Sequence, residues 1–252
     1  MYYFTDFHTH LQDHAFTDDL DAVISRAWTA NVRKFVCNST SPDDWTAVKS
    51  VSEKYSNVFP CFGVHPWFVE NLQTGWEQRL EHILETTPSA IGEIGLDQTV
   101  QPRNDSLQED VFRKQLEIAR KMSLPVMLHT VKSVWRICEI LHEIGDLPAI
   151  LLHSFSGPTD RIMELVKLGC YFSFSATVLN PSSRRAKEAV ASVPDNRILL
   201  ESDSPFLAQQ KGQRNEPSVI SDICAEIATI RNMTCEQIER IVFENGRAFF
   251  SF

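Results

Sequence analysis

The chain has 252 residues, of which 43% are hydrophobic and 23% charged, and its formal net charge is −9. This composition is typical of a globular protein with a large core and excludes a disordered chain. The acidic balance argues against a protein that coats long nucleic acid with a basic surface. No apolar run in the sequence approaches the roughly 18 residues that span a bilayer.

Short apolar runs alternate with amphipathic runs from one end of the chain to the other. The apolar runs predict strands at 2–7, 34–39, 58–64, 89–95, 124–129, 148–153, 169–175 and 196–202. Their interiors are continuously apolar, which is typical of buried parallel strands. The amphipathic runs predict helices at 17–30, 42–55, 76–87, 106–122, 131–144, 158–168, 182–192, 217–231 and 234–249.

This alternation is not interrupted by a linker or a low-complexity stretch, so we predict a single α/β domain over residues 1–252. Eight strands that alternate with helices at this length favour a closed (β/α)8 barrel of the TIM type. An open doubly wound sheet is the alternative. In a barrel, the carboxyl ends of all strands share one rim, so side chains at those ends would meet.

The amino terminus and the cysteines bear on the cellular compartment. The segment MYYFTDF lacks a basic stretch followed by an apolar one, so we predict no signal peptide. The six cysteines form no CxxC pair and are expected to be buried thiols in a reducing environment. We therefore expect a cytoplasmic protein with no membrane segment, and we see no sign of an obligate protein partner.

Imidazoles and carboxylates collect at the carboxyl ends of the predicted strands. The first strand ends in His8 and His10, whose spacing puts both side chains on one face of an extended segment. Later strand ends supply the other members: His65, Glu93, His129, His153 and Asp203. Divalent cations such as zinc accept imidazole nitrogen and carboxylate oxygen. The pattern therefore predicts a metal site on this rim.

Each of these residues alone has a simpler interpretation. An isolated HxH is frequent by chance, and Asp203, two residues before Pro205, can cap a helix. Glu93 is harder to explain in this way, because a buried carboxylate without a partner is costly. Without His65, the set still offers four imidazoles and two carboxylates, whereas a catalytic zinc usually takes three protein ligands. This excess favours two ions bridged by Glu93.

The motifs resemble those of the TatD-like metal-dependent hydrolases, which belong to the amidohydrolase-type barrel superfamily. They run along nearly the whole chain: TDFHTHL, GVHPW, AIGEIGLD, FRKQLEIARKMSLPVMLHT, LLHSFSG, GCYFSFS, LLESDSPF and RNEPS. The resemblance implies a divalent-metal deoxyribonuclease, often of the 3′–5′ exonuclease type.

The resemblance also implies roles for individual residues. One ion would lie among His8, His10, Glu93 and Asp203, and the second among Glu93, His129 and His153. The substrate-binding residues implied by the matched motifs are His65 in GVHP, Ser154 in HSFSG and Asn215 in RNEP.

Two segments depart from the family pattern. The family usually has an aromatic residue after IGEIGLD, where this chain has Gln98. After LHT it usually has Arg followed shortly by Ala, where this chain has VKSVW at 131–135. We interpret Lys132 as a solvated side chain rather than a replacement for the missing cation. Both segments border the expected pocket, so the departures bear on substrate preference more than on metal binding.

We therefore expect hydrolysis of a phosphodiester, at a nucleic-acid end or in a small substrate, by a metal-activated water. Asp203 and Glu93 are the predicted catalytic residues, with Asp203 as the general base. The two ions would be zinc, manganese or magnesium. The alternatives are a related hydrolase acting on an ester or amide such as aminoacyl-tRNA, a one-zinc deaminase of the superfamily, and a barrel that binds a metal or ligand without turnover.

Overall fold

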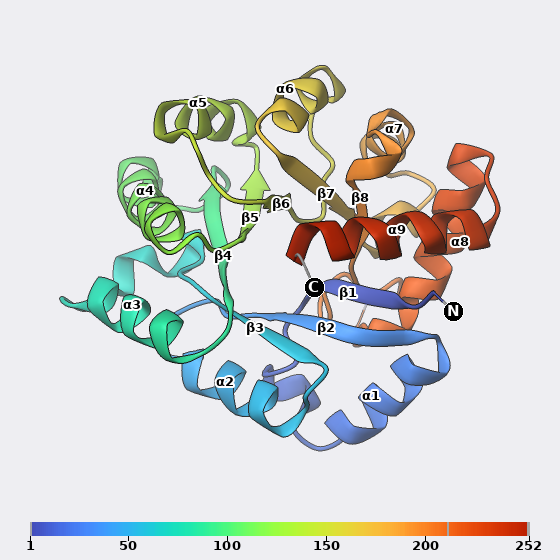
Figure 1. Cartoon of the computed structure of the whole chain (residues 1–252), viewed down its shortest axis with the longest axis horizontal. Helices are drawn as coiled ribbons and strands as arrows, with labels where there is room; N and C mark the ends of the chain where they lie inside the picture. The colour runs from blue at the N-terminus through green and yellow to red at the C-terminus, as the bar shows by residue number, and fades with distance from the viewer. Residues whose placement is uncertain (1, 211, 251–252) are drawn as a thin grey trace.

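The computed structural model describes residues 2–210 and 212–250. Within these ranges one parallel sheet holds the strands in chain order, each strand pairing with the next. They are β1 (Phe4–Thr9), β2 (Val32–Asn38), β3 (Val58–Phe62), β4 (Ala90–Asp97), β5 (Val126–Val131), β6 (Ile150–Leu152), β7 (Cys170–Phe174) and β8 (Ile198–Leu200). Figure 1 shows the strands around a central axis, with helices outside them. The predicted (β/α)8 barrel is confirmed, and the open sheet is excluded.

The helices that cover the barrel follow the predicted pattern. They are α1 (Leu20–Thr29), α2 (Trp45–Lys54), α3 (Trp76–Thr86), α4 (Asp105–Met122), α5 (Val134–Ile144), α6 (Ile162–Lys167), α7 (Arg184–Ser192), α8 (Ile220–Arg231) and α9 (Cys235–Phe250). Across residues 2–210 and 212–250, none of the helices has the length and apolar character needed to cross a lipid bilayer.

Strands β4 and β5 both run two residues beyond their predicted ends. Their last residues pair with one another, Leu96 with Thr130 and Asp97 with Val131. The pairing lengthens both strands together, and it delays the start of α5, which was predicted at residue 131, to Val134. Local periodicity could not show this extension, because it depends on a partner strand more than 30 residues away.

A small apolar cluster fills the interior of the barrel. Each strand contributes one buried side chain to it: Phe7, Val36, Cys61, Ala90, Met127, Leu151, Tyr171 and Leu199. One residue from every strand can meet in this way only if all of them point toward the barrel axis. Phe249 from α9 packs against Phe7 and Tyr171 and closes this cluster.

The seam between β1 and β8 closes the barrel without a full ladder. A single bridge joins Thr9 to Ser204, and the Asp203 N–H donates to the His8 carbonyl at 2.9 Å. Side chains reinforce the seam, because the backbone N–H and the hydroxyl of Ser202 both donate to the buried carboxyl group of Asp6. The same contacts hold the end of β1 against the segment after β8.

The cysteines agree only in part with the expectation of buried thiols. Five are buried, whereas Cys235 is exposed at the start of α9. The first turn of that helix lies at the surface, so its position in an amphipathic pattern did not guarantee burial.

Candidate metal centre

Glu93 lies at the centre of the histidines that were predicted from the strand ends. Its Oε2 atom is 3.2 Å from His8 Nε2 and 3.6 Å from His10 Nε2. Its Oε1 atom is 2.8 Å from His129 Nδ1 and 2.9 Å from His153 Nε2. The two carboxylate oxygens therefore face two different pairs of imidazoles.

Asp203 joins the first of these pairs. Its Oδ1 atom lies 3.8 Å from His8 Nε2 and 3.6 Å from His10 Nε2. The residue adopts a positive φ of 54°, a left-handed conformation that aspartate tolerates better than most side chains. This turn after β8 directs the carboxylate back over the rim, so the six candidate ligands lie in one place.

Oxygen acceptors orient three of the histidines from the side of the ring away from Glu93. The contacts are His10 Nδ1 to the Asn38 carbonyl (2.8 Å), His129 Nε2 to Asp97 Oδ2 (3.2 Å) and His153 Nδ1 to Glu201 Oε1 (3.3 Å). Carbonyl and carboxylate oxygens accept hydrogen bonds, so each outer nitrogen carries the hydrogen. A neutral ring with its hydrogen on the outer nitrogen leaves the lone pair of the inner nitrogen for a cation. A protonated ring donates from the inner nitrogen to Glu93 instead, and although burial opposes it, Glu93 contributes to the raised pKa values of His129 and His153.

This arrangement of inner nitrogens and outer acceptors is the one that holds metal-ligating histidines in the required tautomer. The donor set therefore fits divalent cations. Clusters of three ligand atoms within 4.8 Å of one another occur here, including His8, His10 and Asp203.

The carboxylates at this centre favour their charged form despite burial. Burial alone would raise the pKa of Glu93, but the charge of His153 and the hydrogen bond from His129 help to lower it well below its usual value. Burial likewise opposes ionisation of Asp203, and the neighbouring imidazole of His10 lowers its pKa overall. Both side chains are thus suited to bind a cation.

His65 differs from the other histidines in the direction of its hydrogen. Its Nδ1 accepts a hydrogen bond from the Trp67 backbone N–H at 3.1 Å, so the neutral ring carries its hydrogen on Nε2. That Nε2 lies 3.5 Å from Glu93 Oε1. Burial lowers the pKa of His65 well below its usual value, which keeps the ring neutral. His65 therefore presents a donor, not a lone pair.

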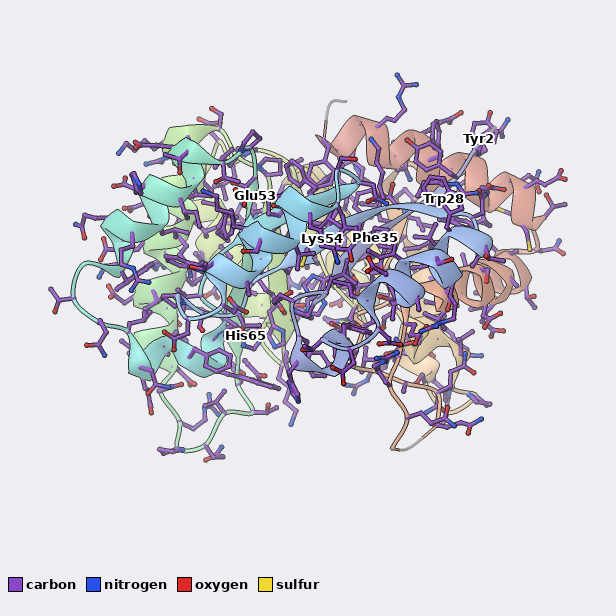
Figure 2. All side chains as sticks on the ribbon, turned by 90° about the horizontal axis from the view of Figure 1, so that it is seen from below. Tyr2, Trp28, Phe35, Glu53, Lys54 and His65 are labelled. Carbon is purple, nitrogen blue, oxygen red and sulfur yellow. The ribbon has the colours of Figure 1, made fainter. Side chains whose placement is uncertain are left out.

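A cavity of about 550 Å³ opens onto the cluster. Five of the six candidate ligands form part of its wall: His10, Glu93, His129, His153 and Asp203. His8 lies beneath them with no exposed surface. In Figure 2, His65 lies toward the end of the barrel opposite α9 and Tyr2, which places the cavity at the carboxyl ends of the strands.

The chain matches the family model described as TatD related DNase over residues 5–251. It belongs to the TatD family. The TatD-family protein is 31% identical to the uncharacterized metal-dependent hydrolase YabD of Bacillus subtilis, over 97% of this chain and 98% of that protein. It is 34% identical to the putative deoxyribonuclease tatdn3 of Danio rerio, over 98% of this chain and 97% of that protein.

A solved structure agrees with this assignment. The crystal structure of YJJV, a TatD homolog from Escherichia coli K12, superimposes with a TM-score of 0.93 at 27% identity, covering 99% of this chain and 98% of that one. The match to the family over nearly the whole chain and the buried cluster of candidate ligands together identify the protein as a metal-dependent hydrolase.

The structure does not bring Ser154 and Asn215 to the cavity, although both were predicted to contact substrate. The Ser154 hydroxyl pairs with the Ser175 hydroxyl at 2.7 Å. The Asn215 side chain is 5% exposed and donates to the Ser202 carbonyl at 2.7 Å, so it anchors the loop after β8. Neither forms part of the cavity wall in this TatD-family chain, and Lys132 does not either.

Two acids of the TatD-family site were missed by the sequence reasoning. Asp97 and Glu201, which orient His129 and His153, are 1% and 0% exposed. Both stand at the ends of apolar strands inside motifs that were already recognised, AIGEIGLD and LLESDSPF. Like Glu93, both are acids in apolar surroundings, where a buried carboxylate needs a partner.

Proposed function

We propose that this TatD-family hydrolase cleaves phosphodiester bonds and acts as a deoxyribonuclease on nucleic-acid ends, of the 3′–5′ exonuclease type. The position of Glu93 between two groups of nitrogen atoms is the observation that supports it. Such a bridge suits two divalent cations, and two-ion sites stabilise the attacking and leaving oxygens of phosphoryl displacement. The relatives in Danio rerio and Homo sapiens are named as a putative deoxyribonuclease and a deoxyribonuclease.

The chain's own residues divide between the two ions. His8, His10 and Asp203 would hold one ion together with Glu93 Oε2. His129 and His153 would hold the other with Glu93 Oε1. Imidazole-rich ligands favour zinc or manganese over magnesium, which prefers oxygen.

When bound, the ions would polarise the phosphoryl group and lower the pKa of water. Asp203 takes the proton from the attacking water, because its carboxylate is ionised and lines the cavity. His65 donates its Nε2–H to an oxygen of the phosphate and thereby positions it. Glu93 keeps the ligand group at its Oε2 and the ligand group at its Oε1 in fixed relative positions.

Replacing Asp203 with Asn tests this assignment. The amide keeps the size of the side chain but cannot act as a base at neutral pH, so we expect kcat on single-stranded DNA to fall by about 10²- to 10⁴-fold. Circular dichroism should remain unchanged. Asp110→Asn, an exposed change on α4, is the control. Wild-type turnover by the Asp203→Asn protein would reject the role of Asp203.

The substrate class is tested by parallel assays of the metal-loaded protein on DNA ends and on aminoacyl esters. We expect hydrolysis of the DNA ends in the presence of zinc or manganese, and loss of activity after chelation. Hydrolysis of aminoacyl esters alone would overturn the nuclease proposal. Metal binding without any product would assign the chain to non-catalytic barrels.

A further inference from the structure

Two large aromatic side chains on the cavity wall are exposed to solvent. Trp67 is 61% exposed and Phe206 is 51% exposed, although most large apolar residues of the chain are buried. Trp67 lies in the short helix Pro66–Asn71 after β3, and Phe206 follows β8. Exposed aromatic surface that lines a cavity is typical of a ligand contact.

The metal centre anchors both residues, Trp67 through its side chain and Phe206 through its backbone. The Trp67 Nε1–H donates to Asp97 Oδ2 at 2.8 Å, the same carboxylate that orients His129. The Phe206 backbone N–H donates to the Asp203 carbonyl at 2.8 Å. Neither ring is buried in the core, and both remain exposed at the cavity wall.

The two rings stand beside different halves of the centre. The Phe206 ring lies 5.5 Å from the ring of His10, which belongs to the ligand group at Glu93 Oε2. The Trp67 ring lies 6.4 Å from the ring of His129, which belongs to the group at Oε1. A phosphate bound over Glu93 would therefore have one aromatic ring on each side.

The charge of the cavity opposes a long polyanion. Among the residues that the structure describes, its wall contains no lysine or arginine, and it includes two further acids, Asp13 and Asp44. Proteins that bind single strands over many nucleotides combine aromatic stacking with a basic groove. Here the aromatic half of that arrangement is present, and the basic half is missing from the wall.

We propose that Trp67 and Phe206 each stack on one of the two bases that flank the scissile phosphate, and that the site recognises a short unpaired end over two nucleotides. This inference rests on the proposed phosphodiesterase function and adds its substrate class. Stacking needs a free face of the base, so a paired end must fray before it is cleaved. Phosphates further along the strand contribute little to binding, because the part of the cavity wall that the structure describes has no lysine or arginine to contact them.

The test uses the metal-loaded full chain and a thymidine dinucleotide. Two analogues lack one base each, and a third lacks both, with a tetrahydrofuran sugar in place of the nucleoside. In the wild-type protein each missing base should lower kcat/KM roughly 5- to 150-fold, the range of base–aromatic stacking. The Trp67→Ala protein should have the same kcat/KM with and without the base at one position. The Phe206→Ala protein should show this at the other position.

Trp28→Ala and Trp135→Ala are matched controls, because both tryptophans are about as exposed, at 52% and 54%, but lie outside the cavity wall. Both variants should keep the wild-type discrimination between the dinucleotides. The decisive quantity is the ratio of kcat/KM between substrates, since damage to the metal centre through Asp97 would lower kcat/KM on all of them together. If Trp67→Ala and Phe206→Ala each lose the same factor in kcat/KM on all four substrates, neither ring contacts a base. That result would overturn the stacking inference and leave the proposed function standing.

Salt dependence supplies a second measurement on a single strand of about 20 nucleotides. Each phosphate neutralised by the protein contributes about −0.7 to the slope of log(1/KM) against log salt for single strands. We expect a slope no steeper than about −1, whereas a slope steeper than about −2 would reveal a basic track and overturn the short footprint. If the unaltered metal-loaded protein cleaves neither the dinucleotide nor the strand, the proposed function fails and this inference fails with it.

Discussion

Asp97 and Glu201 show how single buried acids act through their neighbours. Asp97 accepts hydrogen bonds from the rings of His129 and Trp67. Glu201 faces the outer nitrogen of His153 and also accepts from the Ser173 hydroxyl. Burial by itself would raise the pKa of Asp97, but the hydrogen bond from His129 and those from Thr99 and Trp67 lower it far below its usual value. An ionised acid in this position keeps the inner nitrogen of the histidine free for a metal.

Replacing Asp97 with Asn should therefore weaken metal binding rather than the fold. We expect a 10- to 100-fold loss of zinc affinity, the effect usual for outer partners of metal ligands. Competition with a fluorescent chelator measures it. Glu164→Gln is the matched control, because Glu164 Oε1 lies 3.1 Å from Nε2 of His142, a surface histidine outside the centre. Equal zinc affinities in the two variants would show that Asp97 has no orienting role.

At the scale of secondary structure, the close approach of β4 to β5 positions Glu93 against His129. Gly95 adopts a φ of +147°, and a Cβ built there would lie 2.0 Å from the His129 carbonyl oxygen. A side chain cannot fit unless one of the two strands moves. The glycine is thus required by the contact between the strands that carry these two ligands.

Gly95→Ala should destabilise the protein by about 3 kcal/mol or more, because steric overlap with the backbone adds to the conformational strain. Gly169→Ala isolates the strain, since Gly169 has a φ of +84° with open space around the position of its Cβ. That control should lower the free energy of unfolding by only about 1–2 kcal/mol. Urea unfolding compares the two. A smaller loss for Gly95→Ala than for Gly169→Ala would contradict the close-approach argument.

At the scale of the whole molecule, the seam between β1 and β8 closes the barrel and brings together ligands from opposite ends of the chain. Asp6 is buried within this seam, where burial raises its pKa to about 8 despite hydrogen bonds from Ser202. The folded protein therefore retains a proton on this carboxyl group at pH values where the unfolded chain, with a pKa near 3.8, has lost it. The stabilising contribution of that proton is full below pH 3.8 and is lost as the pH rises toward 8.

Asp6→Asn removes this proton uptake and keeps a neutral side chain of the same size. The free energy of unfolding of the wild type, relative to the variant, should fall between pH 5 and pH 8 by up to about 1.4 kcal/mol per pH unit. Urea titrations of both metal-loaded proteins at each pH measure the difference, in which proton binding by their common histidines cancels. A difference that stays constant over this range would mean that Asp6 is ionised in the folded barrel.

The sequence by itself determined the order of strands and helices and the set of side chains at the strand ends. Continuous apolar runs and 3.6-residue periodicity are local properties that can be read from the sequence. Their regular alternation over eight strands favours a closed barrel over an open sheet. Once the barrel closes, His8, His10, Glu93, His129, His153 and Asp203 must share its rim. That is why residues almost 200 positions apart could be predicted to meet.

Only the tertiary structure decided which side chains face the cavity from the loops. Ser154 has a φ of 44°, and its hydroxyl pairs with Ser175 on the segment after β7; Asn215 is drawn inward by the Ser202 carbonyl. Trp67 was part of a recognised motif, but its hydrogen bond to Asp97 and its exposure could not be derived from it. Loop side chains take their direction from single dihedral angles and from partners distant in sequence, and neither leaves a periodic pattern in the chain.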